Sequence, residues 1–550
     1  MNVAVIQSHI MVGDFAGNAK RLLAAYNDAV KHGAEIVVAQ EDAIAGYCEG
    51  DQRFYPSFIK GHDTELAALA KGIGEVGLVM SITAKNNGEG KPFLNMAVLI
   101  QNGLITNLQA KTNLATDTVF NDYRFYEMNH GAIVTFPYRG MTTAVLVCQD
   151  LWEVYDAAHG EHYFPRHPVS ELKGKGVELL LVPNASPYYW GKGSARHEMV
   201  KNVVETLGCA VVYANYWGGQ DELVFDGRSF IMNNNGVVVG AAPAYKDAVV
   251  VADLDGPAVT YHFDDGDVQA LEDALVAALR DYTGKNGIKG VVFGLSGGID
   301  SAICAVLAVK ALGPERVICI RMPSQYSSQG SLDDAETLAK NLGIRFDTIP
   351  INDVYELYVK LLGSTIGFGT PTGAFDVTEE NIQARARGNI VMAYANKYGY
   401  MAIATGNKSE FSVGYATLYG DMCGGYALIK DVLKMDIYRL SEWANYEREI
   451  IPRSSITKPP SAELRPDQKD TDSLPDYPVL DRILKGLVEN FQGRDELVAQ
   501  GFDPKVVEKV IMMTDRAEFK RRQAPPGPIV SKEGLAWLNR QYPISTKFRP

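Results

Sequence analysis

The sequence predicts an α/β protein whose two halves have different architectures. The chain has 550 residues, 46% of them hydrophobic, which is enough for roughly two to four domains with large cores. The first half is dense in strand patterns with few helices between them. The second half alternates apolar strands with helical patterns in a regular order. These three observations predict two α/β domains joined by a linker.

Apolar runs of strand length dominate the first half. The chain begins with a predicted strand, Val3–Gln7, and a helix follows over Asn18–His32, in which Leu22, Tyr26 and Val30 have helical spacing. Strands at this density predict a two-sheet layered domain with helices on the outside. Further strands are predicted at Glu35–Ala39, Gly77–Thr83, Asn95–Ile100, Thr142–Val147, Glu178–Pro183, Ala210–Ala214, Ser229–Asn233 and Val249–Leu254.

A polar segment separates the halves. Asp253–Asp267 is rich in Asp, Gly and Pro and has no apolar period, which is typical of a linker. We therefore expect a first domain over residues 1–254, a linker over 255–267 and a second domain over 268–550.

The second half is predicted to be an open parallel sheet with helices on both faces, a doubly wound fold. The proline-rich, charged segment Lys458–Tyr477 predicts a mobile loop over a functional site. The alternating strands and helices are predicted at Val291–Leu295, Ser301–Leu312, Val317–Arg321, Leu332–Leu342, Arg345–Ile351, Glu379–Tyr398 and Met401–Thr405.

Composition excludes several classes of protein. Lys and Arg number 53 and Asp and Glu number 66, so the formal net charge is −13. An acidic surface argues against broad binding to nucleic acid or to anionic membranes. The six cysteines form no CxxC pair and show no metal-ligand spacing, which indicates buried thiols in a reducing compartment. The N-terminal residues lack the pattern of a signal peptide and no apolar run is long enough to span a bilayer, so we expect a cytoplasmic protein.

The strongest local signal is the turn between the strand Val291–Leu295 and the next helix. Two glycines let backbone N–H groups approach a phosphate, two serines add donors, and the helix dipole favours an anion. Asp300 would repel a bare phosphate, so it is a candidate ligand for a metal ion that neutralises the oxygens. The alternative is an ordinary capped turn. The candidate phosphate-binding residues are Gly294, Leu295, Ser296, Gly297, Gly298, Ile299, Asp300 and Ser301.

This turn resembles the signature of the PP-loop ATP pyrophosphatase superfamily, whose members adenylate a carbonyl or amide oxygen and release pyrophosphate. Further motifs follow in order and resemble those of the NAD synthetase family. They begin at Arg321, Glu380, Ala404, Tyr419, Lys434, Pro460 and Phe519. The resemblance covers about residues 291–522 and implies an adenine nucleotide α-hydrolase-like fold.

The same resemblance implies the substrates and their contacts. It implies that the turn binds the pyrophosphate of ATP, that Asp300 and Glu410 bind Mg²⁺, and that the acceptor is nicotinic acid adenine dinucleotide (deamido-NAD). Further ATP contacts are implied for Arg321, Arg387, Thr405, Lys434 and Ser461. Contacts to deamido-NAD are implied for Asn381, Glu410, Asp421 and Lys520. Asn381 and Arg385 share one helical face while Arg387 points elsewhere, which lets one helix contact two substrates.

A second candidate site lies in the first half. Cys148 directly follows the strand Thr142–Val147, Glu41 follows the strand Glu35–Ala39, and Lys111 precedes an acidic residue, Asp122, by eleven positions. Cysteine, glutamate and lysine can act together as a nucleophile, a general base and a cation that stabilises an oxyanion.

These three residues resemble the Glu-Lys-Cys triad of the nitrilase superfamily, and the resemblance covers about residues 1–254. It implies an α-β-β-α sandwich that hydrolyses the side-chain amide of glutamine. It also implies glutamine contacts by Asp117, Ser186 and Lys192. The chain departs from the usual pattern at four places, namely Gln40, Leu114-Ala115, Gln149 and Asp122.

Together the two resemblances imply a glutamine-dependent NAD synthetase. Glutamine would release ammonia in the first half, and the ammonia would attack the adenylated carboxylate of deamido-NAD in the second. The products would be NAD, AMP, pyrophosphate and glutamate. The family further implies an enclosed route for ammonia between domains, small-molecule substrates only, and a homo-oligomer.

Three alternatives stay open at the level of sequence. Another PP-loop amidotransferase, such as a GMP or asparagine synthetase, would carry a different glutaminase half. A tRNA-modifying PP-loop enzyme would need cysteine pairs and a basic face. An inactive binding protein would show damaged motifs.

Overall fold

The computed structural model describes residues 1–116, 120–160, 164–262, 266–366, 376–535 and 539–550. Two compact units are present. One comprises Met1–Gln220 and Val224–Gly266, and the other comprises Asp221–Leu223 and Asp267–Pro550. No helix among the described residues is long and apolar enough to cross a membrane.

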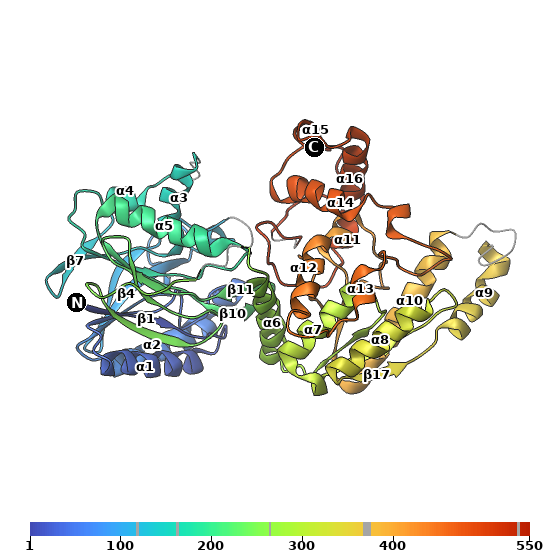
Figure 1. The fold of residues 1–550 in the computed structure, drawn as a ribbon. Helices are drawn as coiled ribbons and strands as arrows, with labels where there is room; N and C mark the ends of the chain where they lie inside the picture. The colour runs from blue at the N-terminus through green and yellow to red at the C-terminus, as the bar shows by residue number, and fades with distance from the viewer. Residues whose placement is uncertain (117–119, 161–163, 263–265, 367–375, 536–538) are drawn as a thin grey trace. The chain divides into compact units, whose positions relative to one another are not determined.

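The first unit contains two six-stranded sheets (Figure 1). The first sheet consists, in spatial order, of β14 (Ala248–Asp253), β1 (Asn2–Gln7), β2 (Ile36–Val38), β3 (Gly77–Lys85), β4 (Phe93–Gln101) and β5 (Leu104–Ala110). The second consists of β13 (Val238–Ala241), β12 (Phe230–Met232), β9 (Ala210–Ala214), β8 (Leu179–Pro183), β7 (Met141–Val145) and β6 (Thr135–Tyr138). The strands β10 (Trp217–Gln220) and β11 (Leu223–Asp226) form a separate pair.

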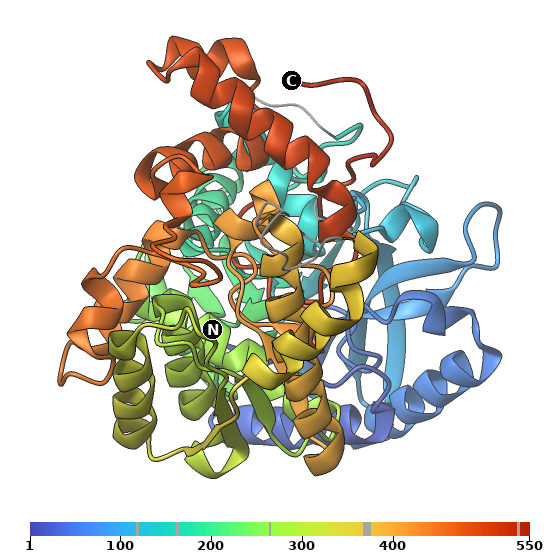
Figure 2. The same cartoon turned by 90° about the vertical axis from the view of Figure 1, so that its right-hand side faces the viewer.

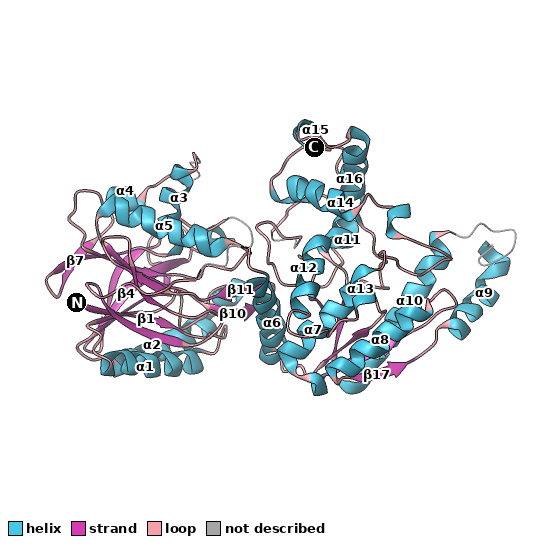
Figure 3. Cartoon of the chain, viewed as in Figure 1, coloured by secondary structure: helices cyan, strands magenta, loops and turns pink. Residues whose placement is uncertain are grey.

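Helices cover the outer face of each sheet, so this unit has four layers (Figure 3). α1 (Phe15–Lys31) and α2 (Pro56–Gly72) pack on the first sheet. α3 (Trp152–Ala158), α4 (Pro168–Glu171) and α5 (Lys192–Leu207) cover the second. Buried aliphatic side chains of both sheets, such as Val5 and Val212, meet in the core between them. This confirms the predicted α-β-β-α sandwich.

The strand directions bring several polar residues to one edge of each sheet. β1, β2 and β3 are parallel, and β5 runs with them because both β3 and β5 are antiparallel to β4. β7, β8 and β9 are parallel in the second sheet. Glu41 and Lys111 therefore lie beyond the carboxyl ends of β2 and β5, and Cys148 lies beyond that of β7.

The second unit is built on a five-stranded sheet in which every pairing is parallel. Its strands, in spatial order, are β17 (Arg345–Thr348), β16 (Val317–Arg321), β15 (Val291–Gly294), β18 (Met401–Ala404) and β19 (Tyr426–Ala427). α7 (Ile299–Leu312) and α8 (Gln329–Leu342) connect β15 to β17 on one face, as right-handed crossovers require. α10 (Val377–Tyr398) packs on the opposite face against Val292, Ile318 and Ile320 (Figure 2). The predicted doubly wound sheet is therefore confirmed.

Smaller helices complete the second unit. α9 lies beside α10, and α14, α15 and α16 form a separate apolar cluster with α11. These and the remaining helices are α6 (Val268–Lys285), α9 (Asn352–Ile366), α11 (Lys408–Val413), α12 (Lys434–Ala444), α13 (Arg453–Thr457), α14 (Tyr477–Leu484), α15 (Arg494–Ala499), α16 (Pro504–Arg516) and α17 (Glu518–Arg521).

Element boundaries differ from the predicted ones by a few residues, and several elements were not predicted. The helix predicted from Ser301 begins at Ile299, because Gly298 occupies the cap position. α5 was not predicted, because polar residues interrupt its apolar spacing and a left-handed Gly191 precedes it. The edge strands β5 and β6 were also missed, since exposed positions dilute their alternation. The described residues between β14 and α6 form neither helix nor strand.

Candidate active sites

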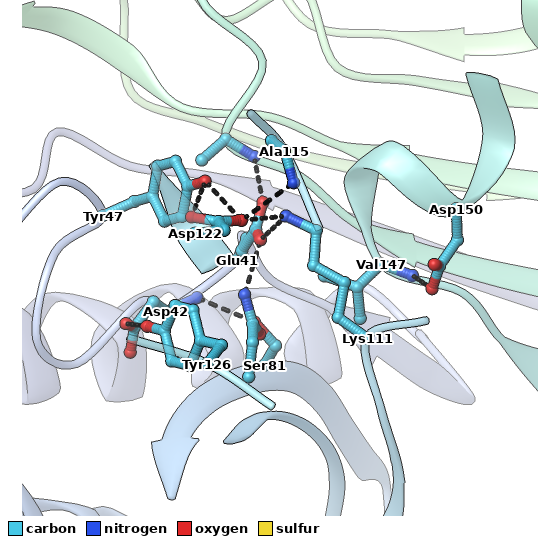
Figure 4. Close-up of polar contacts among 12 residues, drawn as sticks. Glu41, Asp42, Tyr47, Ser81, Lys111, Ala115, Asp122, Tyr126, Val147 and Asp150 are labelled. Carbon is cyan, nitrogen blue, oxygen red and sulfur yellow. Dashed lines mark hydrogen bonds and ion pairs between the residues drawn. The ribbon is translucent and has the colours of Figure 1, made fainter. Parts of the chain in front are cut away.

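The predicted nucleophile, base and cation of the first unit lie together in a buried cluster, of which Figure 4 shows the base Glu41 and the cation Lys111. Lys111 Nζ donates a hydrogen bond of 2.9 Å to Glu41 Oε1. The Cys148 thiol lies close enough to the Glu41 carboxylate for the charge of Glu41 to raise the pKa of the thiol. Glu41 and Lys111 are fully buried, and Cys148 is only 6% exposed. Residues separated by more than 100 positions in the chain are thus brought within contact distance.

Burial and neighbouring charge set the protonation of this cluster. Burial raises the pKa of Glu41, and Lys111 only partly opposes the shift. Burial would lower the pKa of Lys111, but Asp122 and Glu41 outweigh it and hold that pKa well above the usual value. Burial, followed by the Glu41 charge, raises the pKa of the Cys148 thiol. The resting site therefore contains a protonated thiol beside a carboxylate of raised basicity, which suits general-base catalysis.

The backbone at Cys148 is strained. Its φ is +46°, in the left-handed region that side chains other than glycine rarely adopt. Such a conformation costs on the order of 1–3 kcal/mol and persists only where the surroundings enforce it. The residue begins a short 3₁₀ turn, Cys148–Leu151, immediately after the strand. This arrangement holds the sulfur rigidly at the sheet edge.

Three polar neighbours complete the cluster. Asn95 Nδ2 donates to Glu41 Oε1 at 2.7 Å. Asp122 accepts from Lys111 Nζ at 3.0 Å and from the Tyr47 hydroxyl at 2.9 Å. The shorter Asp122, noted in the sequence as a departure, therefore still contacts the lysine. Asn95 was missed; the available signal was an amide in the middle of the apolar strand β4.

The structure describes two of the three residues predicted to bind glutamine, Ser186 and Lys192. Ser186 follows β8, and its Oγ accepts a hydrogen bond of 3.1 Å from the buried Arg196. The neighbouring Ala185 N–H donates to Glu41 at 3.0 Å, so Ser186 adjoins the cluster. Lys192 begins α5, with its ammonium 5.4 Å from the centre of the Trp152 ring. Asp117 lies outside the described residues.

The turn after β15 forms a cradle at the N-terminus of α7. Ser296 Oγ and Ser301 Oγ lie 3.1 Å apart, and the Gly298 N–H donates to Ser296 Oγ at 3.2 Å. Gly297 has a φ of +81°, and a Cβ placed there would lie 2.1 Å from the carbonyl oxygen of Ser331. Only glycine fits this position, so the turn is held close against the start of α8.

This turn opens into a pocket with a volume of about 310 Å³. Burial lowers the pKa of Arg387, which lines it, to about 10, so this guanidinium is still cationic near pH 7 and favours a bound anion. Thirteen predicted substrate residues line the pocket: Gly294, Leu295, Ser296, Gly298, Asp300, Ser301, Arg321, Arg387, Thr405, Glu410, Asp421, Lys434 and Ser461.

Two carboxylates and one lysine meet in this pocket. Lys434 Nζ lies 2.5 Å from Asp300 Oδ2 and 3.6 Å from Glu410 Oε1. Burial, and then the charge of Asp300, raises the pKa of Glu410 to about 8. Asn407 was not singled out, although Asn-x-x-Glu is a capping-box signal. It donates to Asp300 Oδ1 at 2.9 Å and caps the helix that carries Glu410.

Four predicted substrate residues do not line the pocket. Gly297 contacts α8 as described, and Ile299 is buried at the start of α7. Asn381 accepts a hydrogen bond of 2.7 Å from Thr417 Oγ1. Lys520 Nζ donates to the carbonyl oxygens of Gly414 and Ala416 at 2.8 and 2.7 Å.

Asn381 and Arg385 lie on one face of α10 and Arg387 lies on another, as their spacing predicts. Asn381 and Arg385 both contact the segment that contains Thr417 and Leu418. Arg387 instead donates to the carbonyl oxygen of Met322, on the other side of the helix. The two faces of α10 thus meet different parts of the second unit.

Comparisons with known proteins agree with this geometry. The carbon-nitrogen hydrolase family model matches residues 2–260, and the NAD synthase model matches residues 271–524. A glutamine-dependent NAD(+) synthetase from Synechocystis is 39% identical over 561 residues, which cover 100% of this chain and 99% of that protein. The chain belongs to the glutamine-dependent NAD(+) synthetase family.

Other members of the family support the same assignment. The enzyme of this name from Acinetobacter baylyi is 37% identical over 555 residues, with 100% of this chain and 99% of that protein covered. The solved structure of the glutamine-dependent NAD+ synthetase from Acinetobacter baumannii in complex with ADP is 34% identical, with a TM-score of 0.74 and coverage of 99% and 98%. The resemblances of both halves are therefore confirmed, and the alternative PP-loop and tRNA-modifying enzymes are not supported.

Proposed function

We propose that this chain amidates deamido-NAD to NAD, consuming ATP and L-glutamine and releasing AMP, pyrophosphate and glutamate. One observation carries the proposal. A buried Cys-Glu-Lys cluster in the first unit and a glycine-rich phosphate cradle in the second occur in one chain that matches its relatives over full length. The first can release ammonia, and the second can activate a carboxylate to receive it.

In the first unit we assign the steps to named atoms. Glu41 takes the proton of the Cys148 thiol as the sulfur attacks the side-chain carbonyl carbon of glutamine. The Lys111 ammonium stabilises the developing oxyanion. Glu41 returns the proton to the leaving nitrogen, so ammonia departs and a thioester remains. Water, deprotonated by Glu41, then hydrolyses the thioester to glutamate.

In the second unit the residues bind and orient two substrates. The backbone N–H groups and hydroxyls of the turn after β15 hold the phosphates of ATP, and Arg387 and Lys434 add positive charge. The carboxylate of deamido-NAD attacks the α-phosphorus of ATP, and pyrophosphate leaves. Ammonia then attacks the adenylated carbonyl carbon, and AMP leaves as the amide forms. Asp117, Ser186 and Lys192 as glutamine contacts, and Asn381, Asp421 and Lys520 as contacts to deamido-NAD, complete the proposal.

The residues of the pocket fit Mg²⁺. Burial, and then the charge of Asp300, raises the pKa of Glu410, and a divalent cation between the two carboxylates would favour the ionised form of both. Mg²⁺ typically binds one or two carboxylates together with substrate phosphates. No cluster of three or more metal-binding side chains occurs among the described residues, which suits a metal that arrives with ATP. When bound, it would neutralise charge on the phosphate oxygens.

Glu410→Gln and Asp300→Asn are expected to raise the Mg²⁺ concentration for half-maximal NAD synthesis by at least about tenfold. Each change removes one anionic ligand and leaves its shape. Binding of Mn²⁺ with ATP, followed by electron paramagnetic resonance, provides a readout independent of turnover. Basal glutamine hydrolysis serves as the internal control. Native metal affinity in both variants would contradict the assignment.

The pH dependence of glutamine hydrolysis follows from Glu41. The base must be ionised to act, so kcat/KM should fall as the pH is lowered through the pKa of Glu41. Because burial raises that pKa, the midpoint of the fall should lie at a higher pH than it would for an exposed glutamate. Asn95→Leu removes a hydrogen bond to the ionised form, so the midpoint should move further upward. Glutamate release between pH 4 and 8 measures both. A profile that is flat down to the ordinary pKa of about 4.3 would contradict this role.

The direct test of the proposal is NAD formation by the native chain from deamido-NAD, ATP and Mg²⁺, with glutamine and then with ammonium. Glutamate is counted against NAD in the same samples. We expect NAD from both nitrogen sources and nearly one glutamate per NAD, because ammonia passes between the reactions without escaping. If the native chain makes NAD with neither glutamine nor ammonium, deamido-NAD is not the acceptor. A homo-oligomer and a cytoplasmic location also stay predictions.

A further inference from the structure

Asp150 is a fully buried carboxylate that the steps above do not use. Its Oδ1 accepts the backbone N–H groups of Thr112 at 2.9 Å and Asn113 at 2.7 Å. Its Oδ2 accepts the N–H of Val147 at 3.1 Å (Figure 4). Thr112 follows Lys111 in the chain, and Val147 precedes Cys148. One side chain thus joins the backbone beside the lysine to the backbone beside the nucleophile.

These two backbone segments have no strand pairing with each other. Lys111 follows β5 of the first sheet, whereas Cys148 follows β7 of the second. A second link between them, from Gln109 Nε2 to the carbonyl oxygen of Val145 at 2.8 Å, lies further back along both strands. Asp150 therefore provides the connection nearest to the reacting atoms.

Asp150 also closes the strained turn that carries the sulfur. Its own N–H donates to the carbonyl oxygen of Val147 at 3.0 Å while its carboxylate accepts the N–H of Val147. Cys148, with its φ of +46°, lies between these two reciprocal bonds. Loss of the carboxylate frees the turn to relax toward a more common conformation, which would move the sulfur.

We propose that Asp150 is a positioning residue for glutamine hydrolysis, because its carboxylate fixes the Cys148 sulfur relative to the Lys111 ammonium. The inference rests on the proposed glutaminase chemistry. All three external partners of the carboxylate are N–H donors, so a carboxamide of the same shape would place its own NH₂ group against at least one of them. The requirement is therefore for a carboxylate and not merely for a buried polar group.

The test uses the full chain with D150N, D150E and a control, D28N, at an exposed position of α1. For D150N we expect kcat of glutamine hydrolysis to fall about ten- to a hundredfold, because small misplacements of reacting groups have costs of this size. KM for glutamine should stay near the native value, and ammonium-driven NAD synthesis should be unchanged. D150E, which keeps the carboxylate, should lose less than D150N, and D28N should match the native chain.

Several results would overturn the inference. They are a native kcat in D150N, a change confined to KM, or a D150E variant no better than D150N. Loss of ammonium-driven synthesis in D150N would also overturn it, since the role would then be general stability. If the native chain itself hydrolyses no glutamine, the proposed function fails first and the inference falls with it.

Discussion

Cys148→Ala is expected to lose glutamine-driven NAD synthesis by at least about a thousandfold while keeping ammonium-driven synthesis, since removing the nucleophile closes the covalent route to ammonia. The phosphate cradle and its pocket belong to the other unit and contain no atom of this side chain. Alanine also fits the space, because it removes only the sulfur of a 6% exposed residue. The two nitrogen sources thus separate loss of chemistry from loss of fold.

The measurement is NAD formation at saturating deamido-NAD and ATP, with glutamine or with ammonium. Cys209→Ala is a matched control, because Cys209 is buried in the same unit but precedes β9, at the opposite end of the second sheet from the cluster. It should keep both reactions. A C148A chain that still makes NAD from glutamine would show that another residue is the nucleophile. Parallel loss of both reactions would mean that Cys148 is needed for the fold.

The sequence was informative where an apolar strand ends in a polar or glycine-rich residue. Glu41 and Cys148 each follow such a strand, and so does the glycine-rich turn after β15. Lys111 follows β5, which was not predicted, so it was recognised only from its spacing to Asp122 and its resemblance to the nitrilase triad. Parallel strands place such residues at the same edge of a sheet, so a local pattern predicts a shared location. The architecture of the sheets was likewise predicted from local patterns, namely the density of strands in the first half and the alternation of strands and helices in the second.

The partners of these residues could not be predicted in the same way. Asn95 contacts Glu41 across 54 positions, and Asp150 contacts Thr112 across 38 positions. A single polar residue in an apolar strand does not predict which group it contacts, because the register between strands determines the contact. Likewise, Gly297 reads as a phosphate contact in the sequence, whereas its position is explained by its approach to Ser331.

Gly297→Ala is expected to abolish NAD synthesis from both nitrogen sources, with a loss of at least about a hundredfold, since the phosphate cradle must shift to accept the methyl group. The added Cβ would lie 2.1 Å from the carbonyl oxygen of Ser331 and 2.9 Å from its carbonyl carbon, and backbone atoms cannot rotate away. The φ of +81° adds strain for any side chain. Ser296 and Gly298, which flank this residue, would move with it.

Gly330→Ala is the matched control. Gly330 lies in the first turn of α8, next to Ser331, and a Cβ there would meet nothing within 4 Å. Alanine at such a position should leave synthesis unchanged and stabilise the chain slightly, by up to about 1 kcal/mol. Basal glutamine hydrolysis should be native in both variants, because the Cys148 cluster lies in the other unit. A G297A chain with native ammonium-driven synthesis would mean that the turn tolerates displacement, and the pyrophosphate of ATP would then have to be held chiefly by the cationic side chains Arg387 and Lys434.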